Sequence, residues 1–286
     1  MIQQPALQMR GRGCLLDLSR PCIMGVLNVT PDSFSDGGRF ADPELALQQG
    51  LRMAQEGAGL LDIGGESTRP GSKAVPEQEE LDRVIPVIEA LRQETDLPIS
   101  IDTNKAAVAR AAMAAGANFI NDISGLTFDA QMAEVAVTTS AGLFLMHTRG
   151  CPEVMQRDTK YQSLRDEVCA SLQLSIETAV AAGISTEYLA VDPGIGFGKS
   201  AVGNLELLHH ISDLHRFGCP ILLGTSRKSF IGQVLRQDIP TERLAGTLAT
   251  VALGVEQGVQ LFRVHDVKAA VEAAMVAWAV REKKLP

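Results

Sequence analysis

The feature that most constrains the fold of this chain is a repeated alternation of short apolar runs with longer segments of helical period. The apolar runs cover residues 22–27, 60–63, 99–101, 119–120, 143–146, 189–191, 221–223 and 261–264. The helical candidates that follow them cover residues 43–56, 77–94, 105–115, 161–182, 204–217, 242–257 and 267–281. Such alternation is typical of parallel strands joined by crossover helices. The pattern therefore predicts an α/β protein built on eight parallel strands.

The chain length and the number of strands together favour one architecture. A chain of 286 residues could form two ordinary domains or one barrel of about 250 residues. No Ser/Pro-rich linker and no change of composition divides it. We therefore predict a single-domain (β/α)₈ TIM barrel over residues 21–286, after an N-terminal extension of residues 1–20. A doubly wound open sheet is the alternative.

Composition and charge narrow the range of partners. Lys and Arg number 26 against 34 Asp and Glu, and the resulting net charge of −8 repels nucleic acid and anionic membranes. Aromatic residues make up only 4%, which argues against a platform for stacking bases. The five cysteines form no C-x-x-C pair, and the N-terminus has no long apolar run. We expect a cytoplasmic protein that acts on small molecules.

Polar residues follow the carboxyl end of every predicted strand. In chain order they are Asn28, segment 64–69, Asp102, Asn121 with Asp122, His147, Asp192, segment 226–228, and His265 with Asp266. In a TIM barrel all eight strand ends meet at one mouth, where active sites are built. The sequence therefore predicts one polar pocket at that mouth.

Some of these residues have an ordinary structural explanation when each is taken alone. Asp102 and Asp122 could cap the next helix, since an Asp carboxylate accepts the free N–H groups of a first turn. Asp192 differs, because Pro193 and Gly194 force a turn instead of starting a helix. We expect the carboxylate of Asp192 to point into the pocket.

Cationic and metal-binding side chains complete the predicted pocket. Lys228 could be a solvated surface lysine, but the Gly and hydroxyl residues beside it suit an anion. Arg263 and His265 lie two residues apart on one strand and so face the same side, which favours an anion clamp over a core histidine. His147 offers no such partner. Without a His- or Cys-rich cage, the Asn28 amide suits Mg²⁺ better than a transition metal.

Two loops that follow predicted strands are unusually long. Residues 28–38 and 65–72 exceed the roughly two to six residues common in βα connections. They could be ordinary turns, since Gly, Pro, Ser and Asp are turn formers. They also carry opposite charges, Asp36 and Arg69, that could join over a bound ligand. We expect two flexible lids over the pocket.

The motifs of this chain resemble those of the dihydropteroate synthase family. The matching segments, in order, are NVTPDSFSDGG, GGESTRPGS, SIDT, NDISG, MHTRG, DPGIGFGK, SRKS and RVHDV, and they extend from about residue 23 to residue 267. The resemblance implies a TIM-barrel transferase of folate biosynthesis. Its reaction condenses 6-hydroxymethyl-7,8-dihydropterin diphosphate with 4-aminobenzoate, giving 7,8-dihydropteroate and pyrophosphate with the help of Mg²⁺.

The resemblance also implies a role for each matching residue. The residues that would bind the pterin are Asp102, Asn121, Asp192 and Lys228. The residues that would bind the diphosphate are Asn28, Arg263 and His265, with Mg²⁺ on the Asn28 side. Thr68 would lie where the two substrates meet, and 4-aminobenzoate would contact Pro70, Phe197, Ser226 and Lys228. The catalytic set would be Asp36, Arg69 and Lys228, with Asp36 and Arg69 ordering the lids around pyrophosphate.

Two other functions stay open at this point. A pterin-dependent methyltransferase would share the barrel and the pterin-binding carboxylates, but it would not need the Arg263 and His265 clamp or the lids. A catalytically silent pterin-binding paralogue would typically have lost lid or diphosphate residues, and this chain keeps them. The resemblance further implies a homodimer, and, because the family is a target of sulfonamides, it implies that lid residues Phe34 and Pro70 would border such a drug.

Overall fold

Eight parallel strands form a nearly closed barrel in the computed structural model, which describes residues 7–30 and 43–285. The strands are β3 (Cys22–Asn28), β4 (Leu60–Gly64), β5 (Ile99–Asp102), β6 (Phe119–Asp122), β7 (Gly142–Met146), β8 (Leu189–Asp192), β9 (Leu222–Leu223) and β10 (Leu261–Val264). Their order in the sheet is β8-β7-β6-β5-β4-β3-β10-β9, and a parallel bridge between Val191 and Ile221 joins the two ends. Neighbours in the sheet are consecutive in the sequence, except that the first barrel strand, β3, pairs with the last, β10. This order confirms the barrel and excludes the doubly wound sheet.

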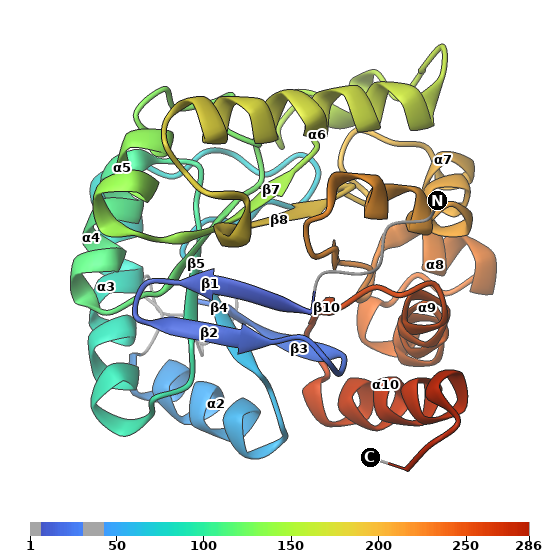
Figure 1. Ribbon diagram of the computed structural model, residues 1–286, viewed down its shortest axis with the longest axis horizontal. Coiled ribbons are helices and arrows are strands. Elements are labelled where there is room, and N and C mark those ends of the chain that lie inside the picture. The colour runs from blue at the N-terminus through green and yellow to red at the C-terminus, as the bar shows by residue number, and fades with distance from the viewer. Residues whose placement is uncertain (1–6, 31–42, 286) are drawn as a thin grey trace.

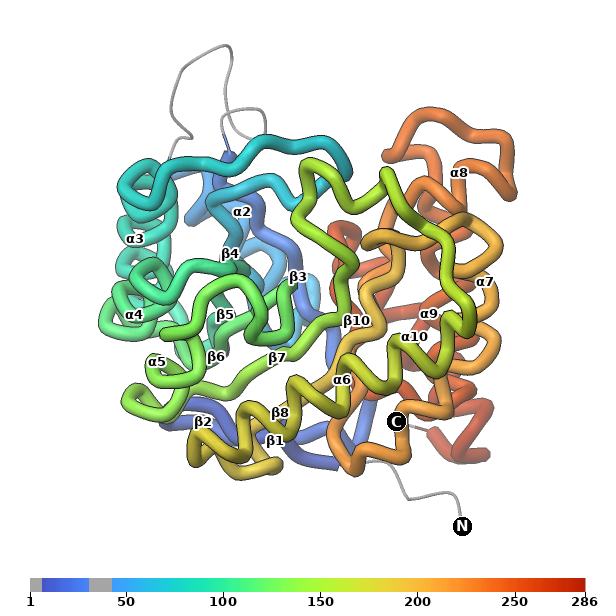
Figure 2. Tube along the Cα trace, turned by 90° about the horizontal axis from the view of Figure 1, so that it is seen from above, coloured from blue at the N-terminus to red at the C-terminus, as the bar shows by residue number. Residues whose placement is uncertain are grey.

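Helices surround the strands on the outside of the barrel (Figure 2). They are α2 (Pro43–Gln55), α3 (Glu77–Glu94), α4 (Ala106–Ala115), α5 (Met132–Thr139), α6 (Leu164–Ala181), α7 (Ala201–His209), α8 (Ser229–Leu235), α9 (Leu244–Glu256) and α10 (Val267–Glu282). Each packs an apolar stripe against the outward side chains of the strands, as Val84, Ile88 and Leu91 of α3 do. The predicted amphipathic periods are thereby confirmed for most segments.

Two helical segments differ from the sequence-based expectation. The predicted helix over 204–217 is broken: α7 ends at His209, and a 3₁₀ helix (Ile211–Phe217) follows, because His210 has a non-helical backbone with φ of −112°. The second difference is α5, which the hydrophobic pattern did not reveal. It is only eight residues long and carries Val135, Val137, Thr138 and Thr139, whose branched side chains lower helix propensity.

The N-terminal extension contains a β-hairpin that covers the amino-terminal end of the barrel (Figure 1). Its strands are β1 (Gln8–Gly11) and β2 (Cys14–Asp17). Met9 is fully buried and joins Phe119 and Phe144 in one apolar cluster. The hairpin therefore closes the barrel floor, and the polar pocket belongs to the opposite end.

Side chains alternate along each barrel strand between the interior and the helices. In β4, Leu61 and Ile63 join the large cluster beneath the helices, whereas Leu60 joins the cluster at the barrel floor. Asp62 therefore points into the barrel, two residues above Leu60. Among residues 7–30 and 43–285, no helix is long and apolar enough to cross a membrane.

Candidate active site

A buried ion network occupies the carboxyl ends of β4, β5, β6 and β10. Arg263 donates from Nε to Asp62 Oδ2 and from Nη2 to Asp102 Oδ2, both at 2.6 Å. Asn121 Nδ2 donates to the same Asp62 oxygen at 3.1 Å. The structure thus brings together Asp102, Asn121 and Arg263, as the sequence predicted, around a fourth residue that the sequence analysis missed. The available signal was a charged residue inside the apolar run of β4.

Burial sets the protonation of this network. Removal from water raises the pKa of Asp102 to about 7, although the nearby Arg263 opposes that rise. Burial alone would lower the pKa of Arg263, but Asp62 and Asp102 outweigh it and raise that pKa. The Oδ1 atoms of Asp62 and Asp102 are buried and find no hydrogen-bond partner within the described part of the chain. These two carboxylate oxygens in the barrel interior can therefore accept hydrogen bonds from the N–H groups of a ligand.

A second cluster lies between β8 and the segment after β9. Lys228 Nζ is 4.1 Å from the centroid of the Phe197 ring, a cation–π contact. Burial lowers the pKa of Lys228 to about 8, while the charge of Asp192 opposes the shift. Asp192 accepts a 2.6 Å hydrogen bond from the Gly194 N–H through Oδ1, and burial raises its pKa. Buried Asp192 and half-buried Lys228 thus interact electrostatically as groups of opposite charge, and Lys228 also contacts an aromatic face.

His147 has a partner, contrary to the sequence-based expectation. Lys199 Nζ lies 2.8 Å from His147 Nδ1 and also donates to the Phe197 carbonyl at 2.8 Å. Burial lowers the pKa of His147 to about 3 and that of Lys199 to about 7. Spacing along the chain could not reveal the contact, because 52 residues separate the pair. Lys199 ties the loop that carries Phe197 to the end of β7.

Ser226, which follows β9, and His265, which follows β10, are in contact. Their Oγ and Nδ1 atoms are 3.0 Å apart, and the His265 backbone N–H donates to the same hydroxyl at 3.2 Å. Burial, together with the charge of Arg263, lowers the pKa of His265 to about 3. His265 is therefore a neutral donor or acceptor near pH 7. Arg263 is turned into the barrel by its carboxylate partners, and its joint clamp with His265 stays a prediction.

The two strand-end aspartates first considered as caps prove to differ. Asp122 accepts hydrogen bonds from the backbone N–H groups of Ser124 at 2.8 Å and Leu126 at 2.7 Å, so it holds its own loop; a helix-cap role is wrong for it, because the next helix, α5, begins only at Met132. Asp102 instead pairs with Arg263, and Lys105 occupies the cap position of α4. A cap role for Asp102 is wrong, because its carboxylate faces the interior of the barrel.

The remaining predicted residues lie on the βα loops. Asn28 is half-buried at the end of β3, and Thr68 is half-buried in the loop after β4. Arg69 and Pro70 are exposed on that same loop. The Gly71 N–H donates to the Pro152 carbonyl at 2.9 Å, which joins this loop to the one after β7. Asp36 and Phe34 lie outside the described residues.

Comparisons with known proteins agree with this geometry. The family described as pterin binding enzyme matches residues 24–265, which include all eight barrel strands except the first two residues of β3. A dihydropteroate synthase from Synechocystis is 48% identical over 261 residues, covering 91% of this chain and 90% of that protein. The chain belongs to the dihydropteroate synthase family. The motifs that suggested this family from the sequence are thereby confirmed as a true relationship.

Two solved structures of dihydropteroate synthases show the same fold. The Yersinia pestis protein, in a sulfonamide drug complex, is 49% identical with a TM-score of 0.91, covering 97% of this chain and all of that one. The Xanthomonas albilineans protein, solved with 4-aminobenzoic acid, is 46% identical with a TM-score of 0.91, covering 98% of this chain and all of that one. These TM-scores over nearly the whole chain show that the barrel fold is shared.

The Mg²⁺ expected from the sequence stays a prediction, and Asn28 is the residue at the mouth that would hold it. Within residues 7–30 and 43–285, no group of three His, Cys, Asp or Glu side chains could hold a metal by itself. The Asn28 amide oxygen is a hard donor at the edge of the mouth, and it faces Gly64 of the adjacent strand. Mg²⁺ keeps several waters and commonly binds through one or two protein oxygens plus substrate phosphates. A single amide ligand is compatible with that preference.

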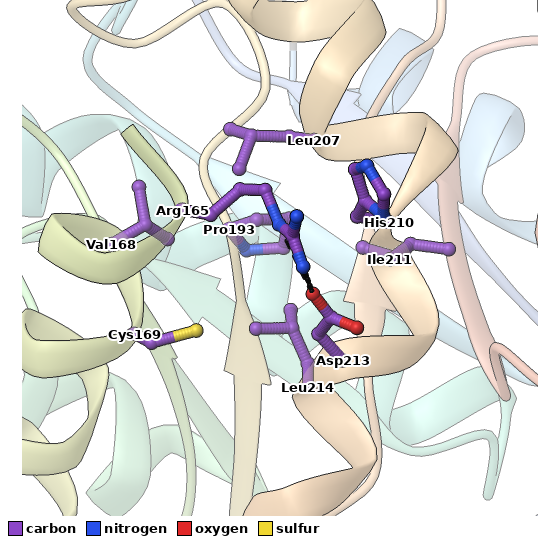
Figure 3. Close-up of a pocket in the computed structure, with 9 residues that line it drawn as sticks. All are labelled: Arg165, Val168, Cys169, Pro193, Leu207, His210, Ile211, Asp213 and Leu214. Carbon is purple, nitrogen blue, oxygen red and sulfur yellow. Dashed lines mark hydrogen bonds and ion pairs between the residues drawn. The ribbon is translucent and has the colours of Figure 1, made fainter. Parts of the chain in front are cut away.

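A small cavity on the outside of the barrel is not part of this site. It lies between α6 and the segment after α7, and Figure 3 shows Arg165 reaching across it toward Asp213. Its volume is about 10 Å³, the lower limit for one water molecule. Cys169 and Pro193 also line it. This cavity is far smaller than the roughly 300 Å³ at which pockets for small-molecule ligands begin.

Proposed function

We propose that this protein condenses 6-hydroxymethyl-7,8-dihydropterin diphosphate with 4-aminobenzoate, giving 7,8-dihydropteroate and pyrophosphate for folate biosynthesis. The observation that carries the proposal is a set of three buried carboxylates and a buried amide, with two half-buried cations beside them, in a chain of the dihydropteroate synthase family. The set is Asp62, Asp102, Asp192, Asn121, Lys228 and Arg263.

The donors and acceptors of this set suit a pterin ring. A 2-amino-4-oxopyrimidine presents adjacent N–H groups to acceptors and a carbonyl oxygen to donors. The unpartnered Oδ1 of Asp102 and the carboxylate of Asp192 supply acceptors, and the Lys228 ammonium supplies a donor. Asn121 can supply either, because an amide has both groups. In a pocket this buried, an unmatched polar group costs about 1 to 3 kcal/mol, so the match gives specificity.

The second substrate is assigned to the outer part of the mouth. Phe197 offers an aromatic face beside Lys228, and Ser226 lies two residues before Lys228 in the chain. Thr68 and Pro70 approach from the loop after β4. The 4-aminobenzoate ring would pack against Phe197 and Pro70, its carboxylate near Ser226 and Lys228, with Thr68 where the substrates meet.

The reaction that fits these residues is SN1-like. The C–O bond to the diphosphate breaks first, and pyrophosphate leaves with the electron pair. The methylene cation is delocalised into the dihydropterin until the amine of 4-aminobenzoate forms the C–N bond and loses a proton. No protein nucleophile is required, so the residues position the substrates, exclude water and neutralise charge.

The charge of the leaving group is assigned to residues at the ends of two adjacent strands, β10 and β3. Arg263 is held by carboxylates, His265 is neutral, and Asn28 lies at the end of β3. Mg²⁺, when bound at Asn28, supplies compensation for the phosphate oxygens. Arg69 and Asp36 would order their loops around pyrophosphate, and Lys228 would stabilise negative charge in the pocket.

A turnover experiment tests this function. The protein is incubated with pterin diphosphate, 4-aminobenzoate and Mg²⁺, and both products are measured. The proposal expects pyrophosphate and dihydropteroate in equal amounts, and neither product without 4-aminobenzoate. Methyl transfer to or from a pterin without pyrophosphate would favour the methyltransferase. Tight pterin binding with no product would favour the silent paralogue.

The proposal also includes a cytoplasmic homodimer. Its support is a band of exposed apolar side chains on three consecutive helices: Val202 and Leu205 of α7, Val234 and Leu235 of α8, and Leu253 of α9. All five cysteines are free thiols, as a reducing compartment would keep them. Sedimentation velocity of the wild-type chain and of Val234→Glu tests the dimer, and cell fractionation tests the compartment.

A further inference from the structure

A cluster of opposite charges outside the pterin site joins the two ends of the loop after β4. Lys105 Nζ donates to Glu66 Oε2 at 2.6 Å, to Glu80 Oε2 at 2.5 Å and to the Val75 carbonyl at 2.8 Å. The Val75 N–H in turn donates to Glu66 Oε2 at 2.9 Å. Lys105 precedes α4, Glu80 lies in α3, and Glu66 and Val75 lie at the two ends of the loop.

The ammonium group of Lys105 is fully used by this cluster. An ammonium has three protons to donate, and three separate oxygens accept them. The side chains of Lys105, Glu66 and Glu80 are 20%, 9% and 1% exposed, so water competes little for these bonds. Burial alone would lower the pKa of Lys105, but the two glutamates raise it, and the group stays charged. We call Lys105, Glu66 and Val75 the loop clasp.

The clasp closes a short ring that carries the predicted loop residues. Thr68, Arg69 and Pro70 lie between Glu66 and Val75. Inside the ring, Ser72 Oγ lies within hydrogen-bond distance of the carbonyl oxygens of Ser67 and, at 2.7 Å, of Arg69, and its one proton can bond either. A loop whose ends are fixed samples fewer conformations, so its central residues are presented near one position before ligand binds.

We propose that Lys105 is a positioning residue for the condensation reaction, acting through the clasp to hold Thr68 and Pro70 at the 4-aminobenzoate end of the mouth. This inference rests on the proposed function for the identity of that substrate. Lys105 bonds the loop ends and lies outside the pterin network of Asp62, Asp102 and Arg263. Its loss should therefore affect 4-aminobenzoate more than the pterin.

The test compares three single variants with the wild type. Lys105→Met removes the clasp cation. Glu66→Ala frees the Val75 N–H but keeps the ion pair between Lys105 and buried Glu80. It therefore still tests the clasp if Lys105→Met does not fold. Lys73→Met is the matched control, because Lys73 is an exposed lysine of the same loop with no ion pair among the described residues.

Kinetics and hydrogen exchange give independent measurements. We expect both clasp variants to raise the KM for 4-aminobenzoate about fivefold or more, while the Kd for a pterin analogue changes less than about twofold. Amide exchange in residues 67–74, including Gly71, should accelerate about tenfold. Lys73→Met should match the wild type in all three measurements.

Three results would overturn the positioning role. One is a clasp variant with wild-type exchange rates, and another is faster exchange with an unchanged KM for 4-aminobenzoate. The third is an equal loss of affinity for both substrates, which would indicate general disruption. If the wild-type chain forms no dihydropteroate, the proposed function fails and the positioning role fails with it, whereas the exchange rates still decide whether the clasp fixes the loop.

Discussion

Asp62 and Arg263 are separated by 201 positions in the chain, yet Asp62 Oδ2 accepts a 2.6 Å hydrogen bond from Arg263 Nε inside the barrel. The same oxygen accepts the amide of Asn121. One fully buried carboxylate therefore orients two side chains that the proposal assigns to the substrates. Because Asp102 binds the other side of the guanidinium, the direction of Arg263 is set from two strands.

Replacing Asp62 should weaken pterin binding although Asp62 has no assigned substrate contact. Asp62→Asn removes the charge that holds Arg263 and can turn an amide N–H group toward the guanidinium. We expect the Kd for a pterin analogue to rise about tenfold, the effect of one unsatisfied buried charge-assisted bond. Calorimetric titration measures this, and a thermal melt confirms that the variant is folded. An affinity within about twofold of wild type would contradict the orienting role.

His147 should make the protein less stable in acid. Its pKa is about 3 in the folded chain, against 6.5 for a free imidazole. Between these values only the unfolded chain binds the proton, so stability is lost as the pH falls below 6.5. His147→Gln keeps an acceptor for Lys199 but removes the titration. We expect its loss of unfolding free energy between about pH 7 and pH 5 to be smaller by about 1 to 2 kcal/mol.

Urea titrations at the two pH values give this comparison directly. His209→Gln is the matched control, because the side chain of His209 is exposed to water in the folded chain. If His147→Gln and the wild type lose the same free energy on acidification, His147 is not held neutral by its buried position beside Lys199.

Pro70 should distinguish a sulfonamide from the substrate. Sulfonamides resemble 4-aminobenzoate but carry an additional ring beyond the carboxylate position, so part of the drug would extend toward the loops. We expect Pro70→Ser to raise the inhibition constant of a sulfonamide by a larger factor than the KM for 4-aminobenzoate, a difference of about 1 to 2 kcal/mol. Steady-state kinetics measure both constants for Pro70→Ser, with Lys73→Met as the control variant. Parallel increases would mean that Pro70 does not border the extra ring.

The two substrates should bind in order. Arg69 is exposed on its loop, and the proposal gives it a ligand only when pyrophosphate is present. We therefore expect 4-aminobenzoate to bind about tenfold more tightly in the presence of pyrophosphate and Mg²⁺ than in their absence. Calorimetric titration of 4-aminobenzoate under both conditions provides the measurement. Equal affinities would exclude ligand-dependent ordering of the site.

The barrel and the place of the site could be predicted from the sequence because both follow from local patterns. Eight apolar runs each end in polar residues, and a barrel brings those ends to one mouth. Asp102 and Asn121 were found in this way, and Arg263 was found from its place two residues before His265 on one strand. Asp62 was missed because it lies one position inside the apolar run of β4, where strand alternation turns it inward and Ile63 outward.

The supporting lysines could not be predicted, because their partners are distant in the sequence. Lys105 lies 39 residues from Glu66, and Lys199 lies 52 residues from His147. Nothing in the sequence around Lys105 distinguishes it from a surface lysine before a helix. Only the packing of α3 and α4 beside the loop brings its three acceptors within reach.

The central claim is that the buried polar mouth of the barrel binds the pterin, and two strand-end aspartates test it most directly. Asp192 and Asp122 are both buried, but Asp192 faces Lys228 whereas Asp122 caps its own loop with both oxygens. Calorimetric titration of a pterin analogue into Asp192→Asn and Asp122→Asn compares them. The account predicts a loss of more than about tenfold for Asp192→Asn only. Unchanged affinity in Asp192→Asn, or equal losses in both variants, would contradict it.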